Sequence, residues 1–357
     1  MKKFRFYPMF FNRRRTRLSW LSLFLVAGWL AIGGVSACAS HHALAPRSTA
    51  GPAGMAWVGP VVASERAMLA RWSGAVGPPV IASHASGATR PTESIALVTW
   101  NVAVGGGDVE ALVADVRRAH PHSELVLLLQ ETYRHGPAVP NAMLADAIVP
   151  GRLGSSRPRG FRDVESIAER LQMNLYYVPS MRNGIPAVSN EDRGNAILST
   201  LPLDNLGAVE LPFERQRRVA VAATAGGVAP DGEPWRVRLV SAHLDNLVSA
   251  RQLWVAGGVF ARARQARALV DYVKTDGTAI VGGDFNTWFG FADLAFVETR
   301  RAFPDTRVTD VRPTFLNLLR LDHVFFRVPD GWTVSFARGA RSYGSDHWPL
   351  IATIRIG

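Results

Sequence analysis

Short apolar runs separated by polar segments dominate the chain from residue 95 to its end. Residues 95–100 and 125–129 are continuous apolar runs of the kind found in buried strands. Similar short runs predict strands at 175–178, 196–199, 219–223, 237–242, 279–281, 321–326, 333–337 and 350–356. Helical spacing marks 109–118, 163–173, where Asp163 is a candidate N-cap, and 261–274. Many short strands with a few helices predict two packed sheets flanked by helices.

Two other regions lack this pattern. Residues 39–92 are rich in Ala, Gly, Pro and Ser, which predicts a flexible linker with one short helix near residues 65–71. Residues 134–160 have no clear periodicity, which predicts a long surface loop. We therefore expect one folded domain over residues 93–357, preceded by the linker.

The first 38 residues have the pattern of a targeting segment. They carry seven Lys and Arg and no acidic residue, and an uncharged apolar stretch runs from Leu18 to Ala37. Subtracting this +7 from the total charge of +11 leaves +4 for the rest of the chain. The run Val35-Ser36-Ala37-Cys38 resembles a lipobox, and Cys38 is the only cysteine. Three interpretations stay open: a lipoprotein, an uncleaved membrane anchor and a cleaved signal peptide. Each predicts that the folded domain lies outside the cytoplasm.

Polar residues that could carry chemistry follow directly after the apolar runs. Singly, each has an ordinary interpretation: Asn as a turn residue, Glu as a solvated strand end, His as a satisfied structural residue. Taken together, carboxylates, amides and histidines at successive strand ends are hard to explain as turns alone. The set consists of Asn101, Gln130-Glu131, His243 and Asp245, Asp284 and Asn286, and Asp346-His347.

With their neighbours, these residues make the sequence similar to the endonuclease/exonuclease/phosphatase superfamily. Gly-Asp-Phe-Asn at 283–286 together with Ser-Asp-His at 345–347 is the most specific part of the resemblance. The other matching pieces are Thr99-Trp100-Asn101-Val102, Leu129-Gln130-Glu131, Arg193-Gly194-Asn195-Ala196-Ile197-Leu198-Ser199, Ser241-Ala242-His243-Leu244-Asp245 and Leu321-Asp322-His323-Val324. The resemblance covers about 93–357 and implies a four-layer α/β sandwich of two mostly antiparallel sheets flanked by helices.

The resemblance implies a metal-dependent hydrolase of phosphate esters. Glu131 is expected to bind the metal, because a hard carboxylate oxygen suits Mg²⁺ or Mn²⁺. The resemblance adds Asn101 and Asp346 near the ion. Among the candidates for phosphate contact, Arg193 is favoured over Arg217 and Arg218, which lie in the middle of the chain.

The resemblance also implies roles in acid–base catalysis. Asp284 would orient or deprotonate the attacking water, and Asn286 would donate hydrogen bonds to the phosphate. His243 would stabilise developing charge or protonate the leaving oxygen. His347 would be the second acid–base histidine, held in one orientation by Asp322. Asp245 is expected to be structural.

The substrate stays open between a nucleic acid and a phospholipid or inositol phosphate. A nuclease needs a basic track, for which the candidates are Arg215, Arg217, Arg218, Arg251, Arg262, Arg264 and Arg267, although solvated arginines are the simpler interpretation. A lipid phosphodiesterase needs exposed apolar residues near the cleft. Trp254, Trp288 and Phe289 are candidates, with core packing as the alternative for the last two. We expect a monomer, and the competing function is a non-catalytic cell-surface binding lipoprotein.

Overall fold

A computed structural model describes residues 42–47, 54–86, 91–140, 162–183, 189–246, 254–273 and 277–357. The chain divides into two units, Met1–Ser40 and His41–Gly357, and the described residues all belong to the second. The basic and apolar N-terminal segment and Cys38 lie outside the described residues, as do 141–160 of the expected surface loop.

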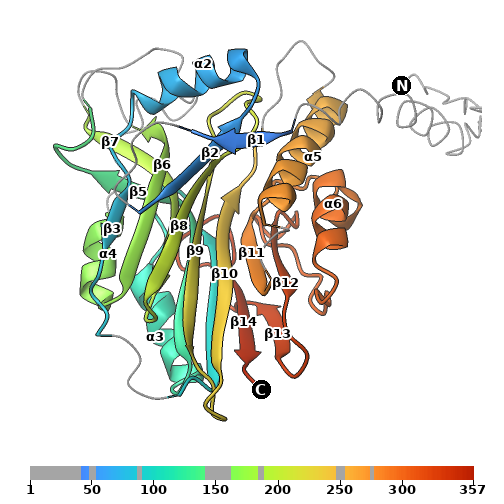
Figure 1. Cartoon of the computed structure of the whole chain (residues 1–357). Helices are drawn as coiled ribbons and strands as arrows, with labels where there is room; N and C mark the ends of the chain where they lie inside the picture. Colours follow the sequence, from blue (N-terminus) through green and yellow to red (C-terminus); the bar gives the residue numbers. More distant parts are fainter. Residues whose placement is uncertain are drawn as a thin grey trace, which may run out of the picture. The chain divides into compact units, whose positions relative to one another are not determined.

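Two seven-stranded sheets form the centre of the second unit (Figure 1). The first has the order β1-β2-β8-β9-β10-β11-β12 and the second the order β13-β14-β4-β5-β7-β6-β3. Only β2 with β8, β4 with β5 and β10 with β11 pair in parallel, so both sheets are mostly antiparallel. The strands are β1 (Leu44–Pro46), β2 (Ala56–Pro60), β3 (Val80–Ala82), β4 (Ser94–Asn101), β5 (Glu124–His135), β6 (Asn174–Asn183), β7 (Glu191–Ser199), β8 (Leu203–Glu210), β9 (Val219–Val228), β10 (Pro234–His243), β11 (Ala279–Asp284), β12 (Asp322–Arg327), β13 (Thr333–Arg338) and β14 (Leu350–Arg355).

Five α-helices and one 3-10 helix accompany the sheets in the described part of the chain. They are α2 (Ala63–Ser73), α3 (Val109–Ala119), α4 (Val164–Leu171), α5 (Trp254–Val273), η2 (Gly290–Ala292) and α6 (Leu294–Ala302). The expected N-cap is confirmed, because the Asp163 carboxylate accepts hydrogen bonds from the backbone N–H groups of Glu165 and Ser166. None of the described helices combines the length and the apolar character needed to cross a membrane.

Three apolar clusters define four layers. Residues from both sheets, such as Val126 and Val221, pack together between them. A second cluster joins the other face of the β4–β7 sheet to α3 and α4, through residues such as Leu112 and Ile167. A third joins the β8–β12 sheet to α5 and α6, through residues such as Leu269 and Phe296. The expected four-layer α/β sandwich is therefore confirmed.

The described residues between 42 and 86 are not the flexible linker expected over 39–92. β1 pairs with β2, β2 extends one sheet beyond β8, and β3 pairs with β6. Arg47 also forms an ion pair with the fully buried carboxylate of Glu210. These strands have only three to five residues, too few to show periodicity, and their partners β8 and β6 lie far along the chain. The short helix expected near 65–71 is present as α2, which buries Leu69 and Trp72.

The expected loop also begins later than the sequence indicated. Arg134 and His135 belong to β5, and Arg134 is buried in an ion pair with Asp192. A charged residue on the end of a strand looks like a loop residue when its partner, 58 positions away, is not known.

Candidate active site

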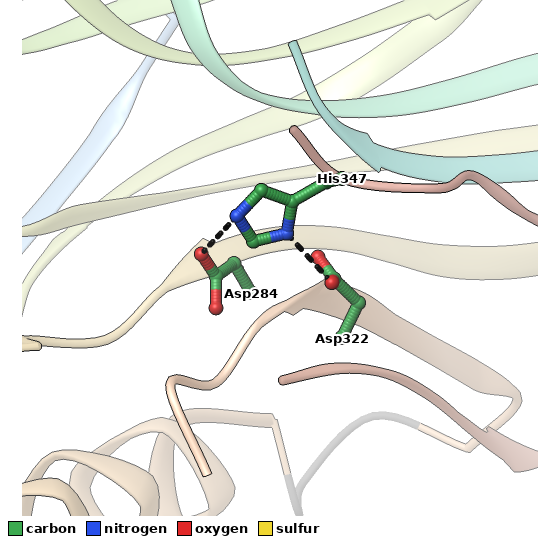
Figure 2. A group of neighbouring side chains, drawn as sticks. All are labelled: Asp284, Asp322 and His347. Atoms are coloured by element: carbon green, nitrogen blue, oxygen red, sulfur yellow. Dashed lines mark hydrogen bonds and ion pairs between the residues drawn. The ribbon is translucent and has the colours of Figure 1, made fainter. Parts of the chain in front are cut away.

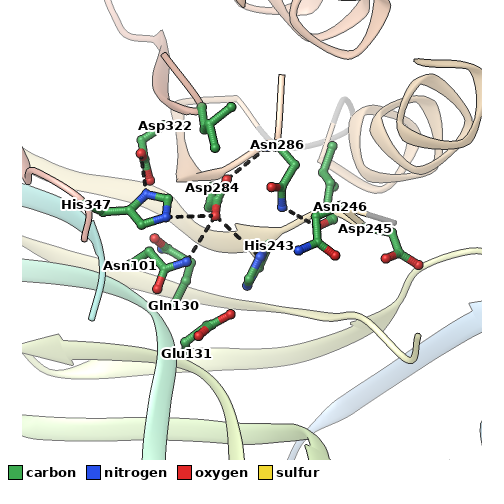
Figure 3. A network of polar contacts seen from close by, with 12 residues as sticks. Asn101, Gln130, Glu131, His243, Asp245, Asn246, Asp284, Asn286, Asp322 and His347 are labelled. Carbon is green, nitrogen blue, oxygen red and sulfur yellow. Dashed lines mark hydrogen bonds and ion pairs between the residues drawn. The ribbon is translucent and has the colours of Figure 1, made fainter. Parts of the chain in front are cut away.

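Side chains from several strand ends converge at one edge of the two sheets (Figure 3). His243 is the last residue of β10 and pairs in register with Asp284, the last residue of β11. Asp284 pairs in turn with Asp322, the first residue of β12. In the other sheet, Asn101 ends β4 and pairs with Gln130 of β5. Parallel pairing of β10 with β11 brings two carboxyl ends to the same edge, which is why residues far apart in sequence meet there.

Asp284 lies at the centre of the site. Its Oδ2 accepts a hydrogen bond from Asn101 Nδ2 at 3.0 Å, and its Oδ1 accepts one from the backbone N–H of Asn286 at 2.9 Å. The Nε2 atoms of His243 and His347 lie 3.4 Å and 3.7 Å from the same Oδ2. Burial raises the pKa of Asp284 to about 7, against the opposing effect of His347. A carboxylate with such a pKa can accept a proton near neutral pH.

His347 is fixed by the carboxylate of Asp322 (Figure 2). Its Nδ1 lies 2.8 Å from Asp322 Oδ2, and the Phe315 ring packs against the imidazole with centroids 4.8 Å apart. Burial lowers the pKa of His347, but the carboxylates of Asp322 and Asp284 outweigh it and raise that pKa to about 10. The imidazole is therefore protonated at neutral pH and faces Asp284 as a cation.

The backbone around His347 is held as firmly as its ring. Trp100 Nε1 donates to the carbonyl of His347 at 2.9 Å, and the N–H of His347 donates to Ser345 Oγ at 3.0 Å. Ser345 Oγ donates in turn to the carbonyl of Asn101 at 2.7 Å. The strand end that carries Asn101 and the loop that carries His347 are thus tied together, which fixes two parts of the site relative to each other.

Glu131 enters the site from a bulge in β5. The register with β7 shifts between Leu129 and Thr132, and Glu131 has the left-handed backbone angle φ of 52°. Such a bulge re-aims a side chain that regular pleating would send elsewhere. The carboxylate is half-buried, and its Oε2 lies 3.5 Å from Arg193 Nη1. Glu131 therefore forms an ion pair with Arg193, although the distance is long for a hydrogen bond.

The expected metal ligands fit a hard divalent cation in their chemistry. Glu131 and Asp346 offer carboxylate oxygens and Asn101 an amide oxygen, which is the donor set that Mg²⁺ and Mn²⁺ prefer. The amide oxygen of Asn101 accepts a hydrogen bond from the N–H of Ala103 at 3.0 Å. Asp346 is half-buried, with its Oδ1 3.5 Å from Ser345 Oγ, and its negative charge contributes to the raised pKa of His347.

A different trio, Asp284, Asp322 and His347, has ligand atoms within 4.8 Å of one another. We interpret it as a hydrogen-bonded relay and not as a metal centre. The 2.8 Å between His347 Nδ1 and Asp322 Oδ2 is the length of a direct hydrogen bond.

The two expected phosphate-contacting residues, Asn286 and Arg193, are both buried. Asn286 has a φ of 50° and donates from Nδ2 to the carbonyl of Leu244 at 3.0 Å. Arg193 is buried and lines a small pocket that also includes Glu131, Arg218 and His243. Arg217 is not available to a substrate. Its side chain is fully buried, and its Nε donates to Glu210 at 2.8 Å.

Two further polar residues complete the network. Gln130 is fully buried and donates from Nε2 to Ser241 Oγ at 2.9 Å, which links the two sheets directly under the site. Asp245 accepts hydrogen bonds from the N–H groups of Arg215 and Gln216 at 2.9 and 3.0 Å, the structural role expected of it. The pairing of Gln130 with Ser241, 111 positions away, has no local sequence signal.

Comparison with known proteins identifies the family. A model of the Endonuclease/Exonuclease/phosphatase family matches residues 98–347, a range that includes every expected site residue from Asn101 to His347. The chain therefore belongs to the endonuclease/exonuclease/phosphatase family, whose members are generally hydrolases acting on phosphoester bonds.

Individual relatives are more distant. A UPF0294 protein of Vibrio cholerae serotype O1 is 39% identical over 98 residues, which cover 26% of this chain and 34% of that protein. The match thus spans about a third of the length of the relative. The structure of an endonuclease/exonuclease/phosphatase from Beutenbergia cavernae DSM 12333 is similar with a TM-score of 0.50 and 19% identity, covering 74% of this chain and 72% of that one. A family protein from Leptotrichia buccalis C-1013-b has a TM-score of 0.48 and 14% identity, with 73% and 100% covered. These structural likenesses concern the fold.

Proposed function

We propose that this protein is an exported, divalent-metal-dependent phosphoesterase. One observation carries the proposal: the buried carboxylate of Asp284 faces the Nε2 atoms of both His243 and His347, at 3.4 Å and 3.7 Å. A carboxylate between two imidazoles combines a proton acceptor with two groups that donate to oxygen. Hydrolysis of a phosphate ester needs both, one for the attacking water and one for developing negative charge.

Each residue of the candidate active site has a separate role in the proposed hydrolysis. Asp284, held by Asn101, accepts the proton of the attacking water. The cationic ring of His347, oriented by Asp322, donates to phosphate oxygens, and His243 stabilises charge on the leaving oxygen or protonates it. Asn286 and Arg193 bind the phosphate. Mg²⁺ or Mn²⁺, held by Glu131 with Asn101 and Asp346, would supply Lewis-acid neutralisation of the phosphate charge.

Export and membrane attachment are part of the same proposal. They are supported by the basic residues that precede the apolar stretch from Leu18 to Ala37 and by Cys38 at its end. The domain would then act in the cell envelope as a monomer, attached through a lipid or through the apolar segment. Its substrate is a phosphate ester, with nucleic acid and phospholipid or inositol phosphate as the two classes to separate.

The test is hydrolysis by the full-length protein with Mg²⁺ or Mn²⁺. Substrates would be bis(p-nitrophenyl) phosphate, DNA, RNA, phospholipid vesicles and inositol phosphates. Asp284→Asn, which keeps the shape of the side chain, is the matched control. We expect the wild type to cleave at least one substrate and the control to lose that activity. Equal rates of cleavage by both proteins would contradict the role of Asp284, and no cleavage of any substrate would favour a non-catalytic binding lipoprotein.

A further inference from the structure

Large apolar side chains are exposed unevenly on the described surface. Nine such side chains are exposed there, and five of them fall between residues 288 and 318. They are Trp288 at 46%, Phe289 at 51%, Val311 at 68%, Leu316 at 52% and Leu318 at 76% exposure. Trp288 and Phe289 therefore do not pack in the core, which was one of the two expectations for them. A concentration of this kind marks an interaction surface more often than scattered single residues do.

Four of these side chains lie on two loops that are attached to the candidate active site. Trp288 and Phe289 follow Asn286 in the first loop. The second is a tight hairpin closed by pairing of Phe315 with Leu319. The loops touch each other, because Thr287 Oγ1 donates to the carbonyl of Arg320 at 2.9 Å.

The hairpin is also bonded to the loop that carries His347. The N–H of Leu316 donates to the carbonyl of Asp346 at 3.0 Å. The ring of Phe315, the preceding residue, packs on the imidazole of His347. A binding partner that contacts the tips of both loops therefore lies beside the candidate active site.

The hairpin tip presents leucine where turn geometry favours other residues. Leu316 and Asn317 have φ angles of 47° and 56°, in the left-handed region. Asn and Gly adopt this conformation readily, whereas a bulky apolar residue does so at a cost. Turn formation therefore does not explain an exposed leucine at position 316. Leu318, two residues further on, is the most exposed large apolar side chain in the described residues.

We propose that Trp288, Phe289, Leu316 and Leu318 form an apolar rim that inserts into a phospholipid bilayer, so that the site acts on lipid phosphate esters at the membrane surface. This proposal rests on the proposed phosphoesterase function and names its substrate class. Apolar and aromatic tips on separate loops suit the headgroup–acyl boundary, which accepts side chains at different depths. A bilayer also presents phosphate esters directly beside its apolar interior.

Charged residues around the rim favour a bilayer over nucleic acid. Arg338 donates to Asn317 Oδ1 at 2.8 Å, which puts a guanidinium at the hairpin tip where lipid phosphates would lie. Leucine side chains offer no stacking surface to bases. Four of the seven arginines considered for a nucleic-acid track form ion pairs within the protein: Arg217 with Glu210, Arg262 with Asp293, Arg264 with Glu65 and Glu214, and Arg267 with Glu298.

The chain outside the described residues also favours a bilayer. Only four residues lie between Ala37, the end of the apolar stretch, and His42, where the description begins. The five residue steps from Ala37 to His42 span at most about 17 Å. If the apolar stretch or a lipid on Cys38 is in the membrane, the domain stays at its surface.

The first test measures depth in the membrane and does not depend on catalysis. Full-length Leu318→Cys protein would carry an environment-sensitive fluorophore and be reconstituted into phosphatidylcholine–phosphatidylglycerol vesicles that contain doxyl-labelled lipid. Val228→Cys is the matched control, because Val228 is 46% exposed and pairs with Pro234 at the end of β10 opposite His243. The nine residue steps of β10 from Pro234 to His243 span about 30 Å in an extended strand. Unsubstituted protein, labelled at Cys38 alone, gives the background.

We expect the doxyl lipid to quench most of the emission from position 318 and little of that from position 228. Equal quenching at both positions, or none at position 318, overturns the proposal. Protection of position 318 by single-stranded DNA but not by vesicles would identify the rim as a base-stacking surface and overturn it as well. Because this measurement involves no turnover, it stands even if the proposed hydrolysis is absent.

The second test separates lipid turnover from turnover in general. The double variant Leu316→Ser/Leu318→Ser should cleave vesicle phospholipid at least about tenfold more slowly than wild type, since two apolar contacts are lost. Its rate on soluble bis(p-nitrophenyl) phosphate should be unchanged, as should both rates of Val228→Ser. A parallel loss on both substrates would show that the rim supports the structure of the site. Wild-type protein that cleaves the soluble diester but not vesicle lipid would refute the rim proposal and leave the phosphoesterase proposal intact.

Discussion

Asp322 Oδ2 and His347 Nδ1 lie 2.8 Å apart, both almost fully buried, and the pairing of β12 with β11 places this contact beside Asp284. The interaction fixes the orientation and the charge of His347 together. A ring that donates from Nδ1 to a carboxylate presents Nε2–H in a single direction, toward Asp284. The geometry thus makes Asp322 a positioning residue for His347.

Replacing Asp322 by Asn should lower the pKa of His347 from its raised value of about 10 toward the ordinary 6.5. A raised pKa in the folded state stabilises the protein fully below the unfolded value of 6.5, and the stabilisation is lost as pH rises through about 10. Asp322→Asn should therefore lower the free energy of unfolding more at pH 6 than at pH 10.5. NMR titration of the imidazole and urea unfolding at both pH values measure this. An unchanged titration curve would mean that Asp322 does not set the charge of His347.

Glu131→Gln should remove metal binding and leave the fold intact. The carboxylate is half-buried and its contact with Arg193 is 3.5 Å long, so little packing depends on it. We expect an almost unchanged melting temperature, a large loss of phosphoesterase turnover and a loss of Mn²⁺ affinity in calorimetric titration. A large fall in melting temperature would show instead that Glu131 acts mainly as a structural partner of Arg193.

Asp284→Asn, unlike Glu131→Gln, should keep its affinity for the metal ion. It should still bind Mn²⁺, yet turnover should fall by about 10²–10⁴, the range for a lost acid–base group. The same calorimetric and kinetic measurements apply to both variants. If the two substitutions reduce metal affinity equally, the division between a metal-binding Glu131 and a proton-accepting Asp284 is wrong.

Glu210→Gln should destabilise the protein strongly. The Glu210 and Arg217 side chains are both fully buried, with Arg217 Nε donating to the carboxylate at 2.8 Å, and Arg47 binds the same carboxylate. Removing one partner leaves a buried charge and costs about 3–5 kcal/mol. Asp204→Asn is the control, because its ion pair with Arg236 is largely exposed, and its stability should be close to that of wild type. Chemical denaturation of both variants measures the free energy of unfolding. Equally small losses of this free energy in the two variants would contradict the structural role assigned to Glu210.

Cys38→Ser tests how the protein is attached to the membrane. A lipobox cysteine is the acceptor of the lipid, so the variant should lose incorporation of radiolabelled fatty acid and the associated processing. Membrane extraction with detergent gives a second readout. Unchanged labelling and extraction would favour a plain anchor or a cleaved signal over a lipoprotein.

The sequence predicted the layered fold because the buried strands are long enough to show as apolar runs. It did not predict β1, β2 or β3, whose stability comes from distant partners such as β8 and β6. Nor did it predict β8 or α6, which lack a strong local pattern of their own. The Ala- and Pro-rich composition indicated flexibility where the ion pair of Arg47 with Glu210 provides attachment.

The candidate active site was also predictable from the sequence only in part. Strand-end positions and the family resemblance grouped Asp284, His243 and His347, and the parallel pairing of β10 with β11 brings His243 and Asp284 to the same edge. The burial of Arg217 and the exposure of Trp288 were not predictable, since an isolated arginine or tryptophan can be core or surface. Contacts such as Gln130 with Ser241 depend on two sheets packing face to face, which no short segment encodes.

Metal dependence of turnover is the most direct test of the central claim. Full-length protein would be treated with EDTA, assayed on bis(p-nitrophenyl) phosphate, and assayed again after addition of Mg²⁺ or Mn²⁺, with Asp284→Asn as the inactive reference. The account predicts that EDTA reduces turnover to the level of the reference and that either ion restores it, since Glu131, Asn101 and Asp346 supply oxygen ligands that suit both. Turnover that persists in EDTA and survives both Glu131→Gln and Asp284→Asn would contradict it.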